Sequence, residues 1–508
     1  MKCRMAFVFA LVCGVSGCYN QQFQYKVPVP ATPAPNTKES AQASVGVIEF
    51  DDMGELWTRC NLTTGDRQEC QLKETTDWIA EQRQAATHAG STSVVIVFVH
   101  GWNHNAKSTD ANLVSFRKLL QTLQDKRDQL VGDCAEHRAS GQFYCHPGSP
   151  PVPVRYIGVY VGWRGRALAG NANYLTPFDR ESSGKRVASV SATEVVFRLR
   201  EEAKKTISHG APEGKFVLIG HSFGGLVVER TVAQALTAAI VLDSSTKATC
   251  SSTAGGYEPF ADLITLINPA IEALETQQLI DMMKRSRFET CPVTDPDNPS
   301  RHFRPPLIVS VKARNDWATG GTFRLLHTFE EADKTFRSYP DTPALTSPQD
   351  RTPGQRTIFK STVGYTSFFH NYCYVDDASS HDSRDPVCNR IIDEVHKGQE
   401  TASKDLALAR PASHFSQNST GTHRQAFTWI PSMASDGGQL SRLYTRFNPD
   451  TCTFASCDVW NNTPYWSFTV PSEVINGHNG FWTPQFEALL SDIVEATAQG
   501  VPKRVGSE

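Results

Sequence analysis

The sequence lacks any block of lysine and arginine of the kind that follows a phosphate backbone. Charged residues make up 20% of its 508 residues, and the formal net charge is only −3. This balance is typical of a soluble globular protein and argues against a nucleic-acid partner. The chain also lacks a Walker phosphate loop and a glycine-rich dinucleotide fingerprint. We therefore expect no nucleotide cofactor.

Metal-binding patterns are missing as well. No C-x-x-C pair or histidine partner pair accompanies the cysteines, and His100, His104, His209 and His221 form no recognisable ligand set. We therefore expect no metal. Ten of the 13 cysteines remain once Cys3, Cys13 and Cys18 are set aside, and this even number favours disulfides in an oxidising compartment. The hypothesis is nearest-neighbour pairing: Cys60 with Cys70, Cys134 with Cys145, Cys250 with Cys291, Cys373 with Cys388, and Cys452 with Cys457.

The first 17 residues differ in character from the rest of the chain. Lys2 and Arg4 precede a short apolar run at residues 6–12, and small or β-branched residues lead to Cys18. This pattern predicts a signal peptide at residues 1–17, too short to span a bilayer. The segment Val-Ser-Gly-Cys resembles the bacterial lipobox, which implies acylation of Cys18 and a membrane as partner. Tyr19 in place of Asp then favours the outer membrane. The alternative is a plain secretory signal in which Cys18 is incidental.

Residues 18–43 are rich in Pro, Ala, Thr and Gln, which predicts an extended tether between the lipid anchor and the folded domain. We expect the folded domain to span residues 44–508. Residues 45–50 and 55–57 flank Asp52-Met53-Gly54, and this arrangement suggests a hairpin.

Buried strands and amphipathic helices then alternate. Strands are predicted from apolar runs at residues 94–99, 156–161, 216–219, 263–267 and 307–311. Helices are predicted after Asp110 and at residues 187–207, 226–240 and 486–496. This alternation indicates an α/β fold with a doubly wound, mostly parallel sheet, whose ligands bind at the carboxyl ends of the strands. Residues from about 325 to 470 break the rhythm, and we interpret them as a long insertion.

Gly220-His221-Ser222-Phe223-Gly224 forms a G-x-S-x-G motif. The motif alone is weak, but here it follows an apolar strand directly and opens an apolar helix, as a nucleophile elbow requires. The strained strand-to-helix turn needs small neighbours, which the glycines supply. The alternative is a glycine-rich packing turn.

With these features the chain resembles the α/β-hydrolases, apart from the insertion before the C-terminal His loop. The resemblance implies an oxyanion hole behind the strand at 94–99, where His100-Gly101 follows. Its backbone donors are expected at Trp102 and Phe223, while His100 itself is expected to be structural. The alternative is that His100-Gly101 is merely a turn.

The resemblance also implies the chain order Ser, acid, His. Asp316 lies just past the strand at 307–311, where the acid is expected; its competitors are Asp243 and Asp262. His478 lies in a glycine-rich loop shortly before the last helix, where the base is expected. The competing histidines all fall in the insertion: His370, His381, His414 and His423.

The leading hypothesis is therefore a serine hydrolase, an esterase or lipase anchored in the bacterial cell envelope. An acyltransferase or peptidase with the same triad is the second, because the fold alone does not separate them. A lipid-anchored binding protein on an inactive hydrolase scaffold is the third. Four aromatic residues suit either an apolar substrate or the core: Trp102, Phe223, Trp317 and Trp482. Oligomeric state is not indicated.

Overall fold

The computed structural model describes most of the chain from residue 43 to residue 498. The described residues are 43–57, 70–135, 152–165, 177–207, 213–243, 260–286, 293–294, 302–303, 306–330, 334–336, 355–365, 370–375, 388–389, 392–393, 427–428, 442–445 and 464–498. The predicted signal peptide, Cys18 and the tether up to residue 42 lie outside the described residues.

A seven-stranded sheet forms the centre of the protein, in the order β1-β3-β2-β4-β5-β8-β12, and every neighbouring pair is parallel. Its strands are β1 Val45–Glu49, β2 Thr92–Val99, β3 Val154–Gly162, β4 Lys215–His221, β5 Leu263–Ile267, β8 Ile308–Ala313 and β12 Tyr465–Val470. All eight residues of β2 are buried, as expected of a central strand covered on both faces. The predicted α/β class with a mostly parallel sheet is confirmed.

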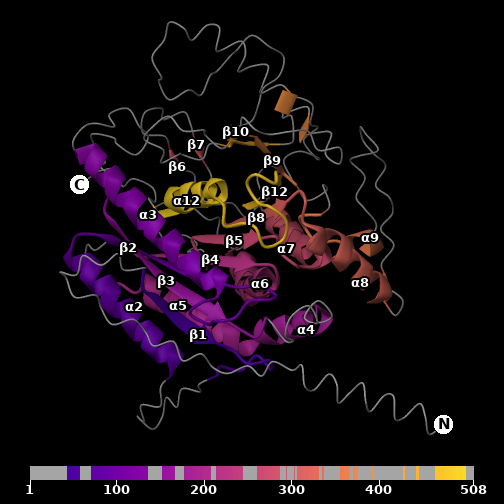
Figure 1. Ribbon diagram of the computed structural model, residues 1–508, viewed down its shortest axis with the longest axis horizontal. Helices are drawn as coiled ribbons and strands as arrows, with labels where there is room; N and C mark the ends of the chain where they lie inside the picture. The colour runs from indigo at the N-terminus through magenta and orange to yellow at the C-terminus, as the bar shows by residue number, and fades with distance from the viewer. Residues whose placement is uncertain are drawn as a thin grey trace, which may run out of the picture.

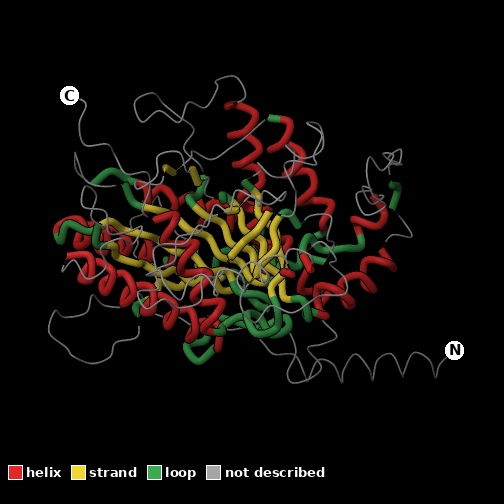
Figure 2. Tube along the Cα trace, turned by 90° about the horizontal axis from the view of Figure 1, so that it is seen from above, coloured by secondary structure: helices red, strands yellow, loops and turns green. Residues whose placement is uncertain are grey.

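Helices cover both faces of the sheet, so the fold has three layers (Figures 1 and 2). Alternate residues of β2 point to opposite faces: Phe98 packs in the core with α3 Ala111–Ala135 and α12 Pro484–Ala498. Val97 packs in the other core, whose helices are α2 Gln71–His88, α5 Val190–Lys204, α6 Phe223–Asp243 and α7 Ala273–Arg285.

Helix α6 is long and apolar enough to cross a membrane, but 56% of its apolar window is buried inside the protein. It contacts β4, β2 and β5 of the sheet and the helices beside it. We therefore interpret α6 as a core helix whose apolar sides face the sheet and its neighbours.

The predicted helix at 187–207 is confirmed over Val190–Lys204, the extent of α5. A separate helix, α4 Pro177–Val187, ends just before it. The break falls at Ser189, whose hydroxyl donates to the carbonyl of Arg186. Such a local side-chain bond offers the backbone an alternative to continued helix.

The predicted hairpin is reduced to one antiparallel bridge between Phe50 and Leu56. Asp51 accepts the backbone N–H groups of Met53 and Glu55, each at 2.9 Å, and so shapes a tight turn. The strand before the turn, β1, pairs in parallel with β3 instead. Asp52 holds this turn in place, because its carboxylate forms ion pairs with two buried arginines, Arg164 at 2.7 Å and Arg180 at 2.6 Å.

The interval that we assign to an insertion, about 325–470, contains a strand of the main sheet. β12 pairs with β8 at the sheet edge, so the insertion ends before Tyr465. The interval also holds a small antiparallel sheet in the order β10-β11-β9, made of β9 Tyr372–Val375, β10 Phe427–Thr428 and β11 Arg442–Thr445. The remaining short elements are β6 Val293–Thr294, β7 His302–Phe303, a π-helical turn at Ala318–Thr322, α8 Phe323–Glu330 and α9 Gln355–Phe359.

The predicted disulfide between Cys373 and Cys388 is confirmed. It closes the end of β9 onto the short segment at residues 388–389. Each of the other four predicted pairs includes at least one cysteine outside the described residues.

Candidate active site

Ser222 occupies a sharp turn between β4, which ends at His221, and α6, which begins at Phe223. Its backbone φ is 55°, a left-handed conformation that a non-glycine residue adopts at a cost. The turn is possible because Gly224 lies against β2: a Cβ there would stand 2.1 Å from the carbonyl oxygen of Val99. The structure therefore has the strained strand-to-helix elbow that the motif predicts.

His478 and Asp316 meet Ser222 at the carboxyl ends of their strands. The Nε2 atom of His478 lies 2.7 Å from the Oγ of Ser222. Its Nδ1 atom lies 3.1 and 3.0 Å from the two carboxylate oxygens of Asp316. All three side chains are buried. With the Nδ1 proton donated to the carboxylate, Nε2 is the atom that accepts the serine proton.

Asp316 is held as a carboxylate by a set of local donors. The N–H groups of Ala318 and Thr319 donate to Oδ1 at 3.0 and 3.2 Å, and the hydroxyl of Thr319 donates to Oδ2 at 2.5 Å. Burial alone would raise the pKa of Asp316. His478, Thr319 and the charge of Lys312 together outweigh burial and lower that pKa to about 2. Asp316 is thus ionised throughout the physiological range and can orient the imidazole.

The loop that carries His478 is fixed by three side chains that the sequence analysis missed. Asn268 donates to the carbonyl of His478 at 2.8 Å, and the ring Nε2 of His221 lies 2.9 Å from the same oxygen. Asn315 accepts the N–H of Gly477 at 2.8 Å. Asn268 directly follows β5 and has a φ of 43°. A polar residue at the carboxyl end of a parallel strand was the available signal for it.

The turn after β2 lies against the nucleophile. A Cβ on Gly101 would stand 2.6 Å from the Cβ of Ser222, so only glycine permits this close approach of the turn to the serine. Phe223 is the first residue of α6, where backbone N–H groups have no partner within the helix and favour negative charge. Trp102 follows Gly101 in this turn and Phe223 begins α6; their roles as oxyanion donors stay predictions.

His100 is a structural residue, as the sequence predicts. The N–H of Trp163 donates to its Nε2 at 3.0 Å, and its Nδ1 lies 2.9 Å from the carbonyl oxygen of Gly101. Both ring nitrogens are used, and burial lowers the pKa of His100 to about 4. A neutral, fully engaged imidazole cannot serve as a second base here.

The competing candidates do not reach the serine in the described part of the chain. Asp262 accepts the N–H of Phe216 at 2.7 Å and pairs with Lys204 at 2.8 Å, which places it at the opposite end of the sheet. His370 lies 3.0 Å from the carbonyl oxygen of Gly364. The remaining competitors fall outside the residues whose side chains are described: Asp243, His381, His414 and His423.

The four aromatic residues near the site divide into two groups. Phe223 is buried in the core, and Trp482 donates to Asn112 at 2.9 Å while packing on Phe98. Trp102 is partly buried against the core. Trp317, beside the acid Asp316, is 60% exposed. Only Trp317 of the four is therefore largely open to solvent at the rim of the site.

A second group of ionisable side chains lies outside the triad. Glu181, Glu272 and His327 each present a ligand atom, and these atoms lie within 4.8 Å of one another. The group contains a carboxylate from α4, a carboxylate just after β5 and an imidazole from α8. Within the described residues it is the group whose composition could hold a metal ion.

Comparisons of this chain with known protein families, curated proteins and solved structures gave no match. The interpretation of the site therefore depends on its own geometry.

Proposed function

We propose that the protein is a serine hydrolase of the α/β-hydrolase kind that cleaves carboxylic esters through an acyl-enzyme on Ser222. The observation that carries this proposal is the hydrogen-bonded line from Ser222 Oγ through His478 to Asp316. The order of the three residues along the chain and the elbow after β4 are those expected of this fold. So is the position of the oxyanion turn, after the neighbouring strand β2.

The geometry supports a two-stage reaction. His478 Nε2 takes the hydroxyl proton as Ser222 Oγ attacks the ester carbonyl carbon, and the resulting oxyanion accepts the N–H groups of Trp102 and Phe223. The intermediate collapses by breaking the bond to the alcohol oxygen, which receives the proton from His478. A water molecule then loses a proton to His478 and attacks the acyl-enzyme, and the second collapse releases the acid and restores Ser222.

This scheme predicts how the rate of ester hydrolysis depends on pH. An imidazolium at residue 478 cannot accept the serine proton, so activity falls at acid pH. Asp316, with its pKa of about 2, stays ionised over the range in which activity is measured. We therefore expect the loss of kcat/KM at acid pH to arise from protonation of the proposed base and not from Asp316, and a rate that does not fall at acid pH would contradict the role of His478.

Labelling with a fluorophosphonate probe tests the catalytic serine. We expect the intact protein to be labelled and Ser222→Ala to be unlabelled. Ser472→Ala is the matched control, because Ser472 is exposed and bonds only to Glu473 in the described structure. A folded, unlabelled wild-type protein would favour the inactive-scaffold hypothesis instead.

The substrate class is tested by a rate survey over esters of increasing chain length, with an amide as control. The exposed ring of Trp317 beside Asp316 supports an apolar acyl group or alcohol at the rim. Faster cleavage of long chains at an interface would indicate a lipase and faster cleavage of short chains an esterase. Cleavage of the amide alone would favour a peptidase, and transfer to an added alcohol without net hydrolysis would favour an acyltransferase.

We further propose that the chain is exported and anchored in the bacterial envelope by acylation of Cys18. The lipobox-like segment before Cys18 supports this proposal. Radiolabelled palmitate is expected to enter the wild-type protein and not Cys18→Ala. A wild-type protein that takes up no label would leave a plain secretory signal as the better interpretation, and equal labelling of both proteins would place the acyl chain on another residue.

A further inference from the structure

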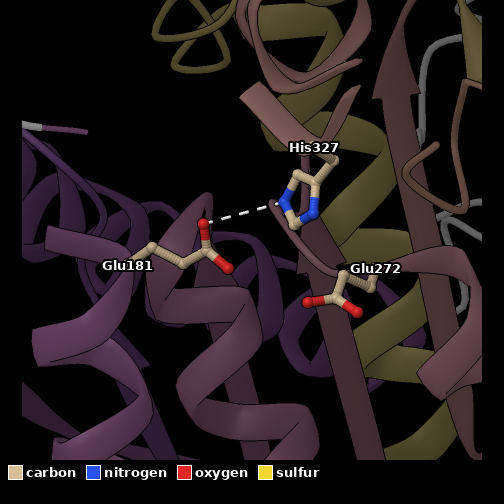
Figure 3. Close-up of side chains that lie close together, drawn as sticks. All are labelled: Glu181, Glu272 and His327. Atoms are coloured by element: carbon tan, nitrogen blue, oxygen red, sulfur yellow. Dashed lines mark ion pairs between the residues drawn. The ribbon is translucent and has the colours of Figure 1, made fainter. Parts of the chain in front are cut away.

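Glu181, Glu272 and His327 converge from three separate elements, α4, the turn after β5 and α8, as Figure 3 shows. His327 is 1% exposed, Glu181 is 5% exposed and the side chain of Glu272 is 13% exposed. Two carboxylates and an imidazole are thus gathered in a place where water has little access. Buried charges of this kind need a partner of opposite sign.

The imidazole of His327 makes only long contacts with carboxylates, because Nε2 lies 3.7 Å from Glu181 and Nδ1 lies 3.4 Å from Glu330. Neither ring nitrogen has a hydrogen-bond partner in the described structure. The ring lies among apolar neighbours, with its centroid 4.0 Å from that of Phe323. Its Nε2 faces Glu181 Oε2 across 3.7 Å, as the dashed line in Figure 3 marks. That gap is too long for a hydrogen bond, and an unpaired buried nitrogen is costly.

Lys185, the cation beside this group, contacts only one oxygen of each glutamate in the described structure. Lys185 pairs with Oε1 of Glu181 at 2.6 Å and with Oε1 of Glu272 at 3.1 Å. The oxygen of Glu181 that faces His327 is Oε2. Lys185 therefore joins the two carboxylates through their Oε1 atoms and does not satisfy the imidazole.

We propose that Glu181, Glu272 and His327 bind a divalent transition-metal ion, with Zn²⁺ as the first candidate. One neutral imidazole and two carboxylates suit Zn²⁺, which is held by His nitrogen and Glu oxygen at about 2.0–2.2 Å. Ligand atoms within 4.8 Å of one another need only small side-chain rotations to reach that geometry. Mg²⁺ and Ca²⁺ prefer sites made of oxygen alone, and the imidazole selects against them.

The ion would join segments that carry the active site. Glu272 follows Asn268, the residue that holds the base loop. His327 lies in the helix that follows the acid Asp316. The proposal nevertheless stands without the hydrolase assignment, because it rests on these three side chains alone. No sequence motif predicts this site, because its three ligands are far apart in the chain and share no characteristic spacing.

Isothermal titration and elemental analysis of the metal-stripped, disulfide-intact full chain test the site. We expect about one equivalent of Zn²⁺ to bind, Mg²⁺ and Ca²⁺ to bind at least about tenfold more weakly, and excess Zn²⁺ to raise Tm by about 3 °C. Glu181→Gln, Glu272→Gln and His327→Gln are each expected to lower the Zn²⁺ affinity by at least about tenfold. Glu194→Gln, an exposed carboxylate on α5, is the matched control and is expected to bind like wild type.

Two results would overturn the proposal. One is the absence of stoichiometric Zn²⁺ binding, which would leave His327 with no partners but Glu181 and Glu330, the latter 3.4 Å from its Nδ1, among the described residues. The other is binding that the three variants leave unchanged, which would place the ion elsewhere. Should His327→Gln fail to fold by circular dichroism, the two isosteric glutamate variants still decide between these outcomes. Neither readout uses ester hydrolysis, so a failure here is distinguishable from a failure of the proposed activity.

Discussion

Asn268 donates its side-chain amide to the backbone carbonyl of His478 over 2.8 Å. The oxygen of the same amide accepts the N–H of Ala313, also at 2.8 Å. Asn268 thereby joins the end of β5 to the last residue of β8 and to the loop of the proposed base. Asn268 thus holds the backbone that carries the imidazole, while Asp316 contacts the ring itself.

The variant Asn268→Asp isolates this connection. The new side chain keeps an oxygen for the N–H of Ala313 but turns a second acceptor toward the carbonyl of His478, so that the loop is repelled. We expect kcat to fall about 10- to 100-fold, because misplacing a catalytic group by about 1 Å costs that much, with KM within about threefold of wild type. Steady-state ester hydrolysis measures the split. An unchanged kcat, or an effect on KM alone, would contradict the positioning role.

Thr319→Val removes the hydroxyl that donates to Asp316 Oδ2. The native carboxyl has a pKa of about 2 against an ordinary 3.8, so the stability it contributes is complete above about pH 4 and is lost as pH falls through 2. Without the hydroxyl the pKa of Asp316 rises, and acid unfolding is expected to begin at higher pH. Fluorescence-monitored acid titration measures the shift.

The matched control for that variant is Thr328→Val. Thr328 is exposed, and its hydroxyl donates to the carbonyl of Arg324. We expect its acid titration to match that of wild type. Equal titration curves for all three proteins would mean that Thr319 does not stabilise the carboxylate.

Glu229 is a fully buried residue of helix α6. Thr276 donates to it at 2.5 Å and Tyr465 at 3.3 Å. Burial is the largest influence and raises the pKa of Glu229 from 4.5 to about 7. The native state therefore holds a proton that the unfolded chain releases, and stability falls as pH rises from about 4.5 to 7.

Glu229→Gln mimics the protonated carboxyl. Between pH 4.5 and pH 8, we expect wild type to lose on the order of 3 kcal/mol that the variant does not lose. Urea unfolding at several pH values measures the difference in the free energy of unfolding. Parallel pH profiles for the two proteins would show that Glu229 is ionised in the native state.

Gly224→Ala tests how tightly the elbow is packed. Its Cβ would stand 2.1 Å from the carbonyl oxygen of Val99 and 2.6 Å from that of His100, and backbone cannot yield cheaply. We expect a loss of about 3 kcal/mol or more in the free energy of unfolding. Gly132→Ala is the control, because no atom lies within 4 Å of the added methyl in helix α3, and there we expect a gain of about 0.5–1 kcal/mol. Thermal unfolding compares the two, and equal stabilities would contradict the packing argument.

The central strands and the triad could be predicted because their signals are local. The continuous apolar run of β2 marks a strand buried on both faces, and Ser222 lies in a motif whose flanking strand and helix are visible in the sequence. His478 was located by its place before the last helix. In each case a few adjacent residues carried the information.

Other parts of the fold depend on partners far away in the chain. Helix α4 is polar, and its Arg180 can be buried because it forms an ion pair with Asp52 at 2.6 Å. In strand β12, the backbone N–H of Ser467 donates to the side-chain oxygen of Asn371 at 2.8 Å. The hydrogen bonds of Asn268 can form only when β5, β8 and the loop that carries His478 lie side by side. A pattern of apolar residues does not contain these relationships.

The proposed base, His478, follows β12, the edge strand that completes the sheet against β8. In the proposed mechanism, a growing polypeptide that has emerged only as far as Asp316 carries Ser222 and Asp316 but lacks the imidazole that accepts the hydroxyl proton. On this proposal, Ser222 becomes reactive only after β12 has paired with β8.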